Sequence, residues 1–367
     1  MAMDCRDDLL VKRVLTRRDL SSCLEFPRPD LLTNALGRIV DECEVIVECS
    51  GDALHATTVV DAALKAGRIV VTMDAEFHVT TGSHFVGRGV MSEAHGDQPG
   101  SLAALAEDAV EMGFSPLVYG NRKGYYHPNP PRDQMEFWSK KQGLSLDQVT
   151  AATDGTKMQI EQALVANGLG ADIIQDGLLG AAAESMREGG AILAEHAKRL
   201  GTPIADYVIA PNDSAGVFIV GEHDLRQRPY LEYLKLGDGP YYTLVQNHHL
   251  CHLEIARTIR RMANGGKPLL DNSMAPRFGV SAVAKRTLWP GERIRRGIGS
   301  FELRGEAVSI AANPHHLPIG LVDDGVVRRR VDPGQRLSLD DMEIPESPAF
   351  AAWRAIAQAV GAGDRAR

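Results

Sequence analysis

The feature that most constrains the fold is a strand–helix–strand pattern over residues 45–73. The short apolar run Val45–Val47 ends in Glu-Cys-Ser-Gly, which predicts a buried parallel strand. Residues 55–66 have helical spacing of apolar side chains up to Gly67, and Arg68–Met73 reads as a second buried strand. Such a βαβ unit places its two strands parallel in one sheet with a right-handed crossover. The chain is therefore expected to be an α/β protein.

Other segments extend this α/β pattern along the chain. A mixed, mostly helical region is expected over 9–40. Further helices are expected over 101–113, with Ser101 as cap, and over 133–143, 157–168, 184–200 and 249–264, and strands over 115–119, 205–210 and 216–221. Glycine-rich residues 80–92 predict a connecting loop, and the three prolines of residues 125–133 predict a fixed, extended loop.

The pattern changes from residue 278 onward, where strands become short and glycine and proline become regular. Residues 284–294 resemble residues 327–337: each has a basic, apolar strand, a Pro-Gly turn and then a polar-Arg-aliphatic step. Two such halves predict a small β-rich module with internal pseudo-symmetry, and a domain boundary near residue 275.

Composition excludes several classes of protein. The net charge of -8 gives no general attraction for nucleic acid or anionic membranes. There is no apolar signal-peptide core at the start, and no apolar stretch reaches the roughly 18 residues of a membrane helix. The five cysteines are odd in number and lack CxxC spacing, which favours a reducing compartment. We expect a soluble cytoplasmic protein whose partner is a small-molecule substrate.

Several motifs together resemble the homoserine dehydrogenases and their relatives. They are VIVECSG at 45–51, VVTMDAEFHVTTG at 70–82, AHGDQPG at 94–100, GNRKG at 120–124, DGTK at 154–157, GEH at 221–223 and HLCH at 249–252. In this order they are similar to the SAF-domain oxidoreductases, the group that includes deoxyxylulose-phosphate-reductoisomerase-like enzymes. The Pro-Gly repeat is similar to the SAF module of sialic acid synthases and antifreeze proteins. The resemblance runs from about residue 40 to about residue 347.

The resemblance implies an NADP- or NAD-dependent oxidoreductase, a dehydrogenase or reductoisomerase, acting on a small polyol, hydroxy acid or sugar phosphate. It also implies a truncated Rossmann-like parallel sheet over residues 1–92 and an α+β catalytic domain over 93–274. A SAF domain over 275–347 and a C-terminal helix or tail over 348–367 would follow.

The chain departs from this family where the first βαβ unit should carry G-x-G-x-x-G. That loop seats a dinucleotide pyrophosphate on a helix N-terminus, and no such motif precedes residue 45. Without a preceding strand, Val45–Val47 becomes a sheet edge, which invites pairing or aggregation. We expect the Leu9–Leu15 segment, a second subunit, or residues lost through a misplaced translation start to cover it. A homo-oligomer is therefore expected.

Three charged residues, Lys123, Asp154 and Lys157, are the first candidates for catalysis. Lys123 follows a predicted strand, where ligands bind in open α/β folds, and could bind an anion or pass a proton to a carbonyl oxygen. Asp154 and Lys157 open a predicted helix, with Glu161 one turn on. Asp154 as an N-cap and Lys157 as a partner of Glu161 would explain this spacing equally well. The equivalent turn of homoserine dehydrogenases bears on the substrate, which favours a catalytic role.

Further candidates lie in the other motifs. His95 and Asp97 are candidate acid–base residues, and Glu76 is a candidate base or a capping residue beside Asp74. The substrate-binding candidates are Glu76, Asn121, Glu161, Glu222 and His223. The cofactor-binding candidates are Ser50, Gly51 and Asp74.

A histidine cluster, His248, His249 and His252 with Glu254, precedes and opens the last predicted helix of the catalytic region. His248 and His252 would share a helix face like half of a metal site, but HExxH is absent. No metal site is expected, and this helix start is expected to pack on the catalytic core, with Cys251 buried and inert.

Two other functions remain open from the residues alone. The chain could be a redox-neutral isomerase, lyase or epimerase that has lost its nicotinamide cofactor, since enolisation needs only a base and an oxyanion stabiliser. It could also be a non-catalytic ligand sensor, or a partner of a full-length homologue that completes its sheet.

Overall fold

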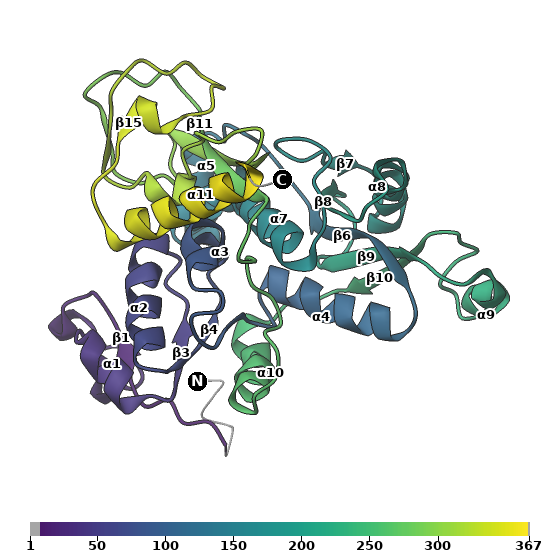
Figure 1. Ribbon diagram of the computed structural model, residues 1–367, viewed down its shortest axis with the longest axis horizontal. Helices are drawn as coiled ribbons and strands as arrows, with labels where there is room; N and C mark the ends of the chain where they lie inside the picture. Colours follow the sequence, from purple (N-terminus) through teal and green to yellow (C-terminus); the bar gives the residue numbers. More distant parts are fainter. Residues whose placement is uncertain (1–7, 366–367) are drawn as a thin grey trace.

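The computed structural model describes residues 8–365 and is a mixed α/β protein, as predicted (Figure 1). The helices are α1 (Leu36–Glu42), α2 (Ala53–Lys65), α3 (Ala75–Thr81), α4 (Gln98–Glu111), α5 (Arg132–Gln142), α6 (Leu146–Thr153), α7 (Thr156–Leu169), α8 (Met186–Leu200), α9 (Arg228–Tyr233), α10 (Cys251–Ala263) and α11 (Pro348–Arg365). The strands are β1 (Val14–Leu15), β2 (Leu32–Thr33), β3 (Val45–Glu48), β4 (Ile69–Thr72), β5 (Met91–Glu93), β6 (Ser115–Lys123), β7 (Ala181–Ala182), β8 (Ile204–Ile209), β9 (Val217–Glu222), β10 (Tyr242–Gln246), β11 (Phe278–Ala284), β12 (Arg293–Ile294), β13 (Leu303–Ser309), β14 (Gly325–Val327) and β15 (Met342–Glu343).

The first sheet is parallel and has the order β3-β4-β5, which confirms the predicted strand–helix–strand unit. Alternate side chains of its strands point to opposite faces. Ile46 and Val70 pack with α2 and α3, whereas Val47 and Val71 pack with Ile259 and its neighbours on α10. Helices therefore cover both faces, as a parallel sheet requires.

The second sheet has the order β10-β9-β6-β8-β7 and lies next to the first along the chain. The strands β6, β8 and β7 are parallel, whereas β9 and β10 are antiparallel to their neighbours. Helices α4 and α7 pack on one face, and α8 packs on the other. The carboxyl end of β6, at Lys123, is thereby directed towards the helices that follow the first sheet.

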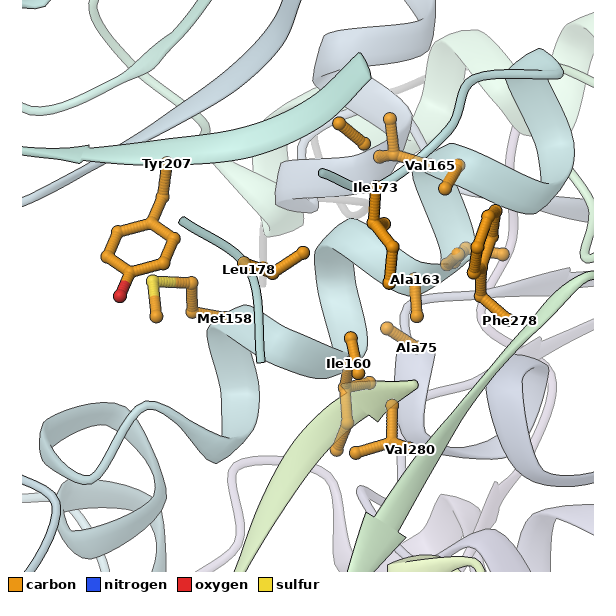
Figure 2. Close-up of a cluster of buried hydrophobic side chains, with 14 of the residues drawn as sticks. Ala75, Met158, Ile160, Ala163, Val165, Ile173, Leu178, Tyr207, Phe278 and Val280 are labelled. Atoms are coloured by element: carbon orange, nitrogen blue, oxygen red, sulfur yellow. The ribbon is translucent and has the colours of Figure 1, made fainter. Parts of the chain in front are cut away.

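Helix α7 lies at the centre of the molecule (Figure 1). It is buried on nearly all sides, which is typical of a core helix rather than a surface one. Figure 2 shows Met158, Ile160 and Ala163 of this helix among side chains from β8 and β11, such as Tyr207 and Phe278. Polar and charged residues of α7 are therefore largely removed from solvent.

The β-rich module, residues 278–343, contains the two-stranded sheet β11-β13 and the three-stranded sheet β12-β14-β15. Leu288 and Val331, which occupy equivalent places in the two similar segments, donate to each other's carbonyl oxygens at 2.9 and 3.1 Å. The equivalent turn glycines bond in matching fashion, Gly291 to the Val327 carbonyl at 2.8 Å and Gly334 to the Ala284 carbonyl at 2.7 Å. The sequence repeat thus corresponds to a local pseudo-twofold arrangement. Helix α11 crosses from this module onto α2 and α3 (Figure 1).

Several sequence-based boundaries were wrong. Among the described residues of 9–40, only the start of α1 is α-helical, with two short 3-10 turns at Leu20–Ser22 and Pro29–Leu31. Residues 80–92 contain the end of α3 and the start of β5 rather than a plain loop. Helix α4 begins at Gln98 after Asp97, so Ser101 lies inside it and does not cap it.

Strand β3 is the edge of its sheet in the part of the chain that the structure describes. Leu9 packs against the same buried cluster as Val45 and Val47, and Leu15 packs against the cluster that includes Ile46. The Leu9–Leu15 segment therefore shares both hydrophobic clusters with β3, whereas its own strand β1 pairs with β2. Among residues 8–365, no helix is long and apolar enough to cross a membrane.

Candidate active site

Five charged residues meet where β4, β5 and β6 end against the first turns of α7. They are Glu76 of α3, Asp97 before α4, Lys123 at the end of β6, and Lys157 and Glu161 of α7. We call them the acid–lysine cluster. In α/β folds, ligands bind outside the carboxyl ends of the strands, so this is the expected place for a site.

Lys157 is the centre of the acid–lysine cluster. Burial disfavours its ammonium form, but the carboxylates of Glu161, Glu76 and Asp97 outweigh burial and raise the pKa of Lys157. The carboxylates therefore hold the ammonium group charged, and Lys157 as a whole residue is only partly buried. A fixed charge of this kind can orient a hydroxyl group or stabilise a developing oxyanion.

Glu161 is held from three sides. Its Oε2 lies 3.6 Å from Nζ of Lys123 and accepts a hydrogen bond from Nδ2 of Asn121 at 2.9 Å. Gln98 bonds to Asn121 and, with its amide turned to satisfy both ends, also donates to Glu161. Such restraint fixes the direction of a carboxylate that faces a substrate.

Asp97 is 7% exposed and immediately precedes α4. Its chain segment approaches α4 and α10 closely: a Cβ on Gly100 would lie 1.9 Å from the Ala94 carbonyl oxygen, and one on Gly96 2.8 Å from Cα of Cys251. Burial raises the pKa of Asp97 to about 6, although Lys157 lowers it. A carboxyl group that titrates near neutral pH suits acid–base work.

This raised pKa gives a testable pH dependence. Because folded Asp97 binds its proton more tightly than the unfolded chain, its contribution to stability is present below about pH 4 and is lost as pH rises through about 6. We therefore expect the wild type to lose stability relative to Asp97→Asn over this range, and the difference to level off above it. Urea unfolding of both proteins across the range measures this, and a difference that does not vary with pH would contradict it.

The histidine candidates lie beside the acid–lysine cluster. Nε2 of His95 lies 3.5 Å from Oε1 of Glu254, and burial lowers the pKa of His95 despite this carboxylate. His249 lies within electrostatic reach of Glu161, and burial lowers its pKa as well. The thiol of Cys251 donates to the Gly96 carbonyl at 2.9 Å, and burial raises its pKa. Among residues 8–365, no three His, Cys, Asp or Glu side chains converge as metal ligands.

Asp154 does not share the contacts of Lys157. Its Oδ2 lies 2.5 Å from Nζ of Lys285 in the β-rich module, and both side chains are buried. Its Oδ1 accepts from the N–H of Thr156 at 2.9 Å. The structure thus places the Asp154 carboxylate, just before α7, in a buried contact with the β-rich module.

Glu222 and His223, which were predicted as pocket residues, lie remote from the acid–lysine cluster. Glu222 pairs across the sheet with Ser115, at the opposite end of β6 from Lys123. Its carboxylate forms a partly exposed ion pair with Lys198 at 2.9 Å, and His223 contacts the Met112 carbonyl. At about 3.3 Å per residue, the length of β6 separates them from the cluster.

The predicted cofactor residues Ser50, Gly51 and Asp74 lie beyond the carboxyl ends of β3 and β4. Gly51 has a φ of +64°, and a Cβ there would meet nothing within 4 Å, so the turn has open space beside it. Asp74 is fully buried, and burial together with Glu76 raises its pKa well above its usual value.

The helix starts beside these residues do not fit a dinucleotide pyrophosphate. Asp52 accepts from two N–H groups in the first turn of α2 at 3.1 and 3.0 Å and pairs with Arg17 at 2.7 Å. Asp74 likewise accepts from the N–H of Phe77 in α3 at 2.9 Å. These N–H donors, which would bind phosphate, are therefore already used, and the Asp52 carboxylate adds negative charge that repels it.

Sequence reasoning missed three residues of this region: His78, Glu93 and Gln98. Glu93 ends β5, whose three residues gave too short an apolar signal to be recognised as a strand. His78 lies on α3, which was predicted as a loop in part. The only signal that could have found Glu93 is its place directly before the Ala-His-Gly-Asp motif.

Comparison with known proteins gives one family match. Residues 96–255 match the model "Oxidoreductase DRL, catalytic domain", less than half of the chain, and this segment contains Asp97, Lys123, Lys157 and Glu161 but not Glu76. No curated protein matches the chain.

Solved structures give weak likenesses. A protein of Bacillus subtilis assigned as an oxidoreductase, YvaA, is 12% identical with a TM-score of 0.35, covering 74% of this chain and 87% of its own. An amine dehydrogenase of Mycobacterium smegmatis is 11% identical with a TM-score of 0.34, covering 67% and 80%. A protein of Thermotoga maritima assigned as a dehydrogenase is 12% identical with a TM-score of 0.35, covering 68% and 81%. These scores carry no argument about function.

Proposed function

We propose that the chain catalyses proton transfer at a hydroxyl or carbonyl group of a small polyhydroxylated substrate. We further propose that it does so as an NAD(P)-dependent dehydrogenase or reductoisomerase related to the SAF-domain oxidoreductases. The observation that carries the proposal is the ammonium group of Lys157, held charged by three carboxylates at the carboxyl ends of the strands. The match of residues 96–255 to an oxidoreductase catalytic domain supports it.

The proposed roles follow from the surroundings of each group. The Lys157 ammonium donates a hydrogen bond to the substrate oxygen and stabilises negative charge that develops there. Asp97, whose pKa lies near 6, accepts or returns the proton. Glu161, fixed by Lys123 and Asn121, accepts from a neighbouring substrate hydroxyl.

The charge of the acid–lysine cluster supports a neutral polyol over a sugar phosphate or hydroxy acid. Three carboxyl groups face two ammonium groups, so an added anion would meet like charge. Polyol hydroxyls, in contrast, can donate to carboxylates and accept from ammonium groups.

The hydride half of such a reaction needs a carrier such as NADPH or NADH. Because the helix starts beside Asp52 and Asp74 do not fit the pyrophosphate, we assign no residue to that carrier and no step to it. The same observation supports a second candidate, a redox-neutral isomerase. Asp97 would then take a proton from carbon next to a carbonyl group while Lys157 stabilises the enolate oxygen.

Titration of the purified chain with NADPH and NADH separates the two candidates. Saturable binding, followed by nicotinamide fluorescence and thermal shift, is the expected result for the oxidoreductase. Asp52→Asn should leave this binding unchanged if, as argued, α2 does not hold the phosphates. Absence of binding at about millimolar cofactor, far weaker than typical cofactor sites, would overturn nicotinamide dependence and leave the isomerase.

A further inference from the structure

A cavity of about 110 Å³ lies beneath α11. Its wall is formed by α3, α7, β11, the segments 272–276 and 310–319, and α11 itself, which packs on α3 (Figure 1). None of the five residues of the acid–lysine cluster lines this cavity. It is therefore a second enclosed space, separate from the candidate active site.

The wall of the cavity is apolar and carries no charge. Within residues 8–365, it contains no Asp, Glu, Lys or Arg. Oγ of Ser83 donates to the Asn272 carbonyl at 3.0 Å and accepts from Nδ2 of Asn272 at 2.9 Å. Oγ1 of Thr80 donates to the Glu76 carbonyl at 2.6 Å. A charged molecule would lose its water here without meeting a counter-ion, so the wall selects a neutral one.

The polar atom of the wall that still needs a partner belongs to His316, which is 7% exposed. Nδ1 of His316 lies 2.8 Å from the Asn313 carbonyl, and since a carbonyl only accepts, Nδ1 carries the proton. Burial lowers the pKa of His316, which keeps the ring neutral and leaves Nε2 as a bare acceptor. In the described part of the chain, Nε2 makes no hydrogen bond.

Gly279 of β11 shows where this nitrogen lies. A Cβ on Gly279 would lie 2.5 Å from Nε2 of His316, and Gly279 itself lines the cavity. The ring of Trp353 on α11 meets the His316 ring at 86°, with the centroids 6.5 Å apart. The free acceptor is thus held between β11 and α11, where a buried acceptor without a donor is costly.

We propose that this cavity binds a small neutral alcohol, whose hydroxyl group donates to Nε2 of His316 while its carbon atoms fill the apolar space. An apolar cavity of about 150 Å³ is known to hold benzene, so the size here corresponds to roughly four or five heavy atoms. The inference goes beyond the proposed function and does not depend on it.

NMR of the ring nitrogens of His316 in the whole chain tests this inference, with cyclobutanol and cyclobutanone as probes. The two molecules have the same ring, but only the alcohol can donate. In histidine-labelled protein at neutral pH, with signals assigned through His316→Phe, free wild type should show Nδ1 protonated and Nε2 bare. Cyclobutanol should shift the Nε2 signal saturably. Cyclobutanone should compete about 2–10-fold more weakly, because it lacks one hydrogen bond.

Two alanines of α11 provide matched variants. Ala357 lines the cavity, so Ala357→Leu should fill it and abolish the saturable shift, whereas Ala351 is exposed and Ala351→Leu should leave the shift unchanged. Circular dichroism checks that both variants fold. If Ala357→Leu does not fold, the comparison of alcohol and ketone in wild type decides.

Four results would overturn the proposal. They are a protonated Nε2 in the free protein, no saturable shift with cyclobutanol, a ketone that competes as well as the alcohol, and binding that persists in folded Ala357→Leu. Absence of binding by either probe would mean that the cavity takes up water at most.

Discussion

Replacement of Asp154 by alanine is expected to lower the free energy of unfolding by about 3–5 kcal/mol, because it leaves a buried ammonium group without its counter-ion. The side chains of Asp154 and Lys285 are 0% and 3% exposed. Nζ of Lys285 also donates to the Ser300 carbonyl at 2.6 Å, so it cannot turn to solvent without breaking a second bond. Urea unfolding followed by circular dichroism measures the change.

The reverse variant, Lys285→Met, gives a loss of stability that depends on pH. Burial already raises the pKa of Asp154, and removal of the ammonium group raises it further. The folded protein then binds this proton more tightly than the unfolded chain, so the variant is least destabilised at low pH and loses stability as pH rises. Asp154→Ala combined with Lys285→Met should cost less than the sum of both.

An exposed ion pair between the same two regions provides the control. Asp147 of α6 lies 3.0 Å from Arg296 of the β-rich module, with side chains 40% and 46% exposed. Asp147→Ala should therefore cost only about 0–1 kcal/mol. If Asp154→Ala costs no more than this control, the Asp154–Lys285 pair does not join α7 to the β-rich module.

The elements that were predictable from sequence are those with strong local signals. The β3–α2–β4 unit has two apolar strands and a helix stopped by Gly67, and the structure has it as predicted. Strand β5 was missed because only Met91 of its three residues is apolar, so its pairing with β4 determines it rather than its own sequence. Helix α3 was missed because it is only seven residues long and its end falls in the glycine-rich segment that was interpreted as a loop.

The candidate site was predictable in part for a similar reason. Lys123, Lys157 and Glu161 lie at a strand end and a helix start, which sequence patterns reveal. Glu222 also follows a strand, but β9 runs antiparallel to β6, so its end lies at the opposite edge of the sheet. Strand direction depends on long-range pairing and is not encoded locally. The burial that makes Glu93 unusual likewise comes from packing of distant elements.

Replacement of Lys157 by methionine is expected to lower the rate by about 10²–10³-fold, the usual cost of removing one group that stabilises a developing oxyanion. Methionine keeps much of the side-chain volume but removes the charge that Glu161, Glu76 and Asp97 surround. Because Lys157 lowers the pKa of Asp97, loss of the ammonium group should also move the Asp97 pKa above 6. The acidic limb of the pH–rate profile of the residual activity should then shift to higher pH. The rate is measured on a polyol identified by screening, across pH.

One further variant separates the charge of Lys157 from its proton, and a second provides a control. Lys157→Arg keeps a positive charge beside Asp97, so it should hold the Asp97 pKa near 6. Because arginine cannot give up a proton, this variant should not restore the rate if the Lys157 ammonium group transfers a proton. A restored rate would mean that the charge alone stabilises the substrate oxygen. Lys198→Met, which removes a partly exposed ion pair with Glu222, should leave the rate unchanged. If Lys157→Met behaves like Lys198→Met, with circular dichroism showing both folded, the acid–lysine cluster is not the active site.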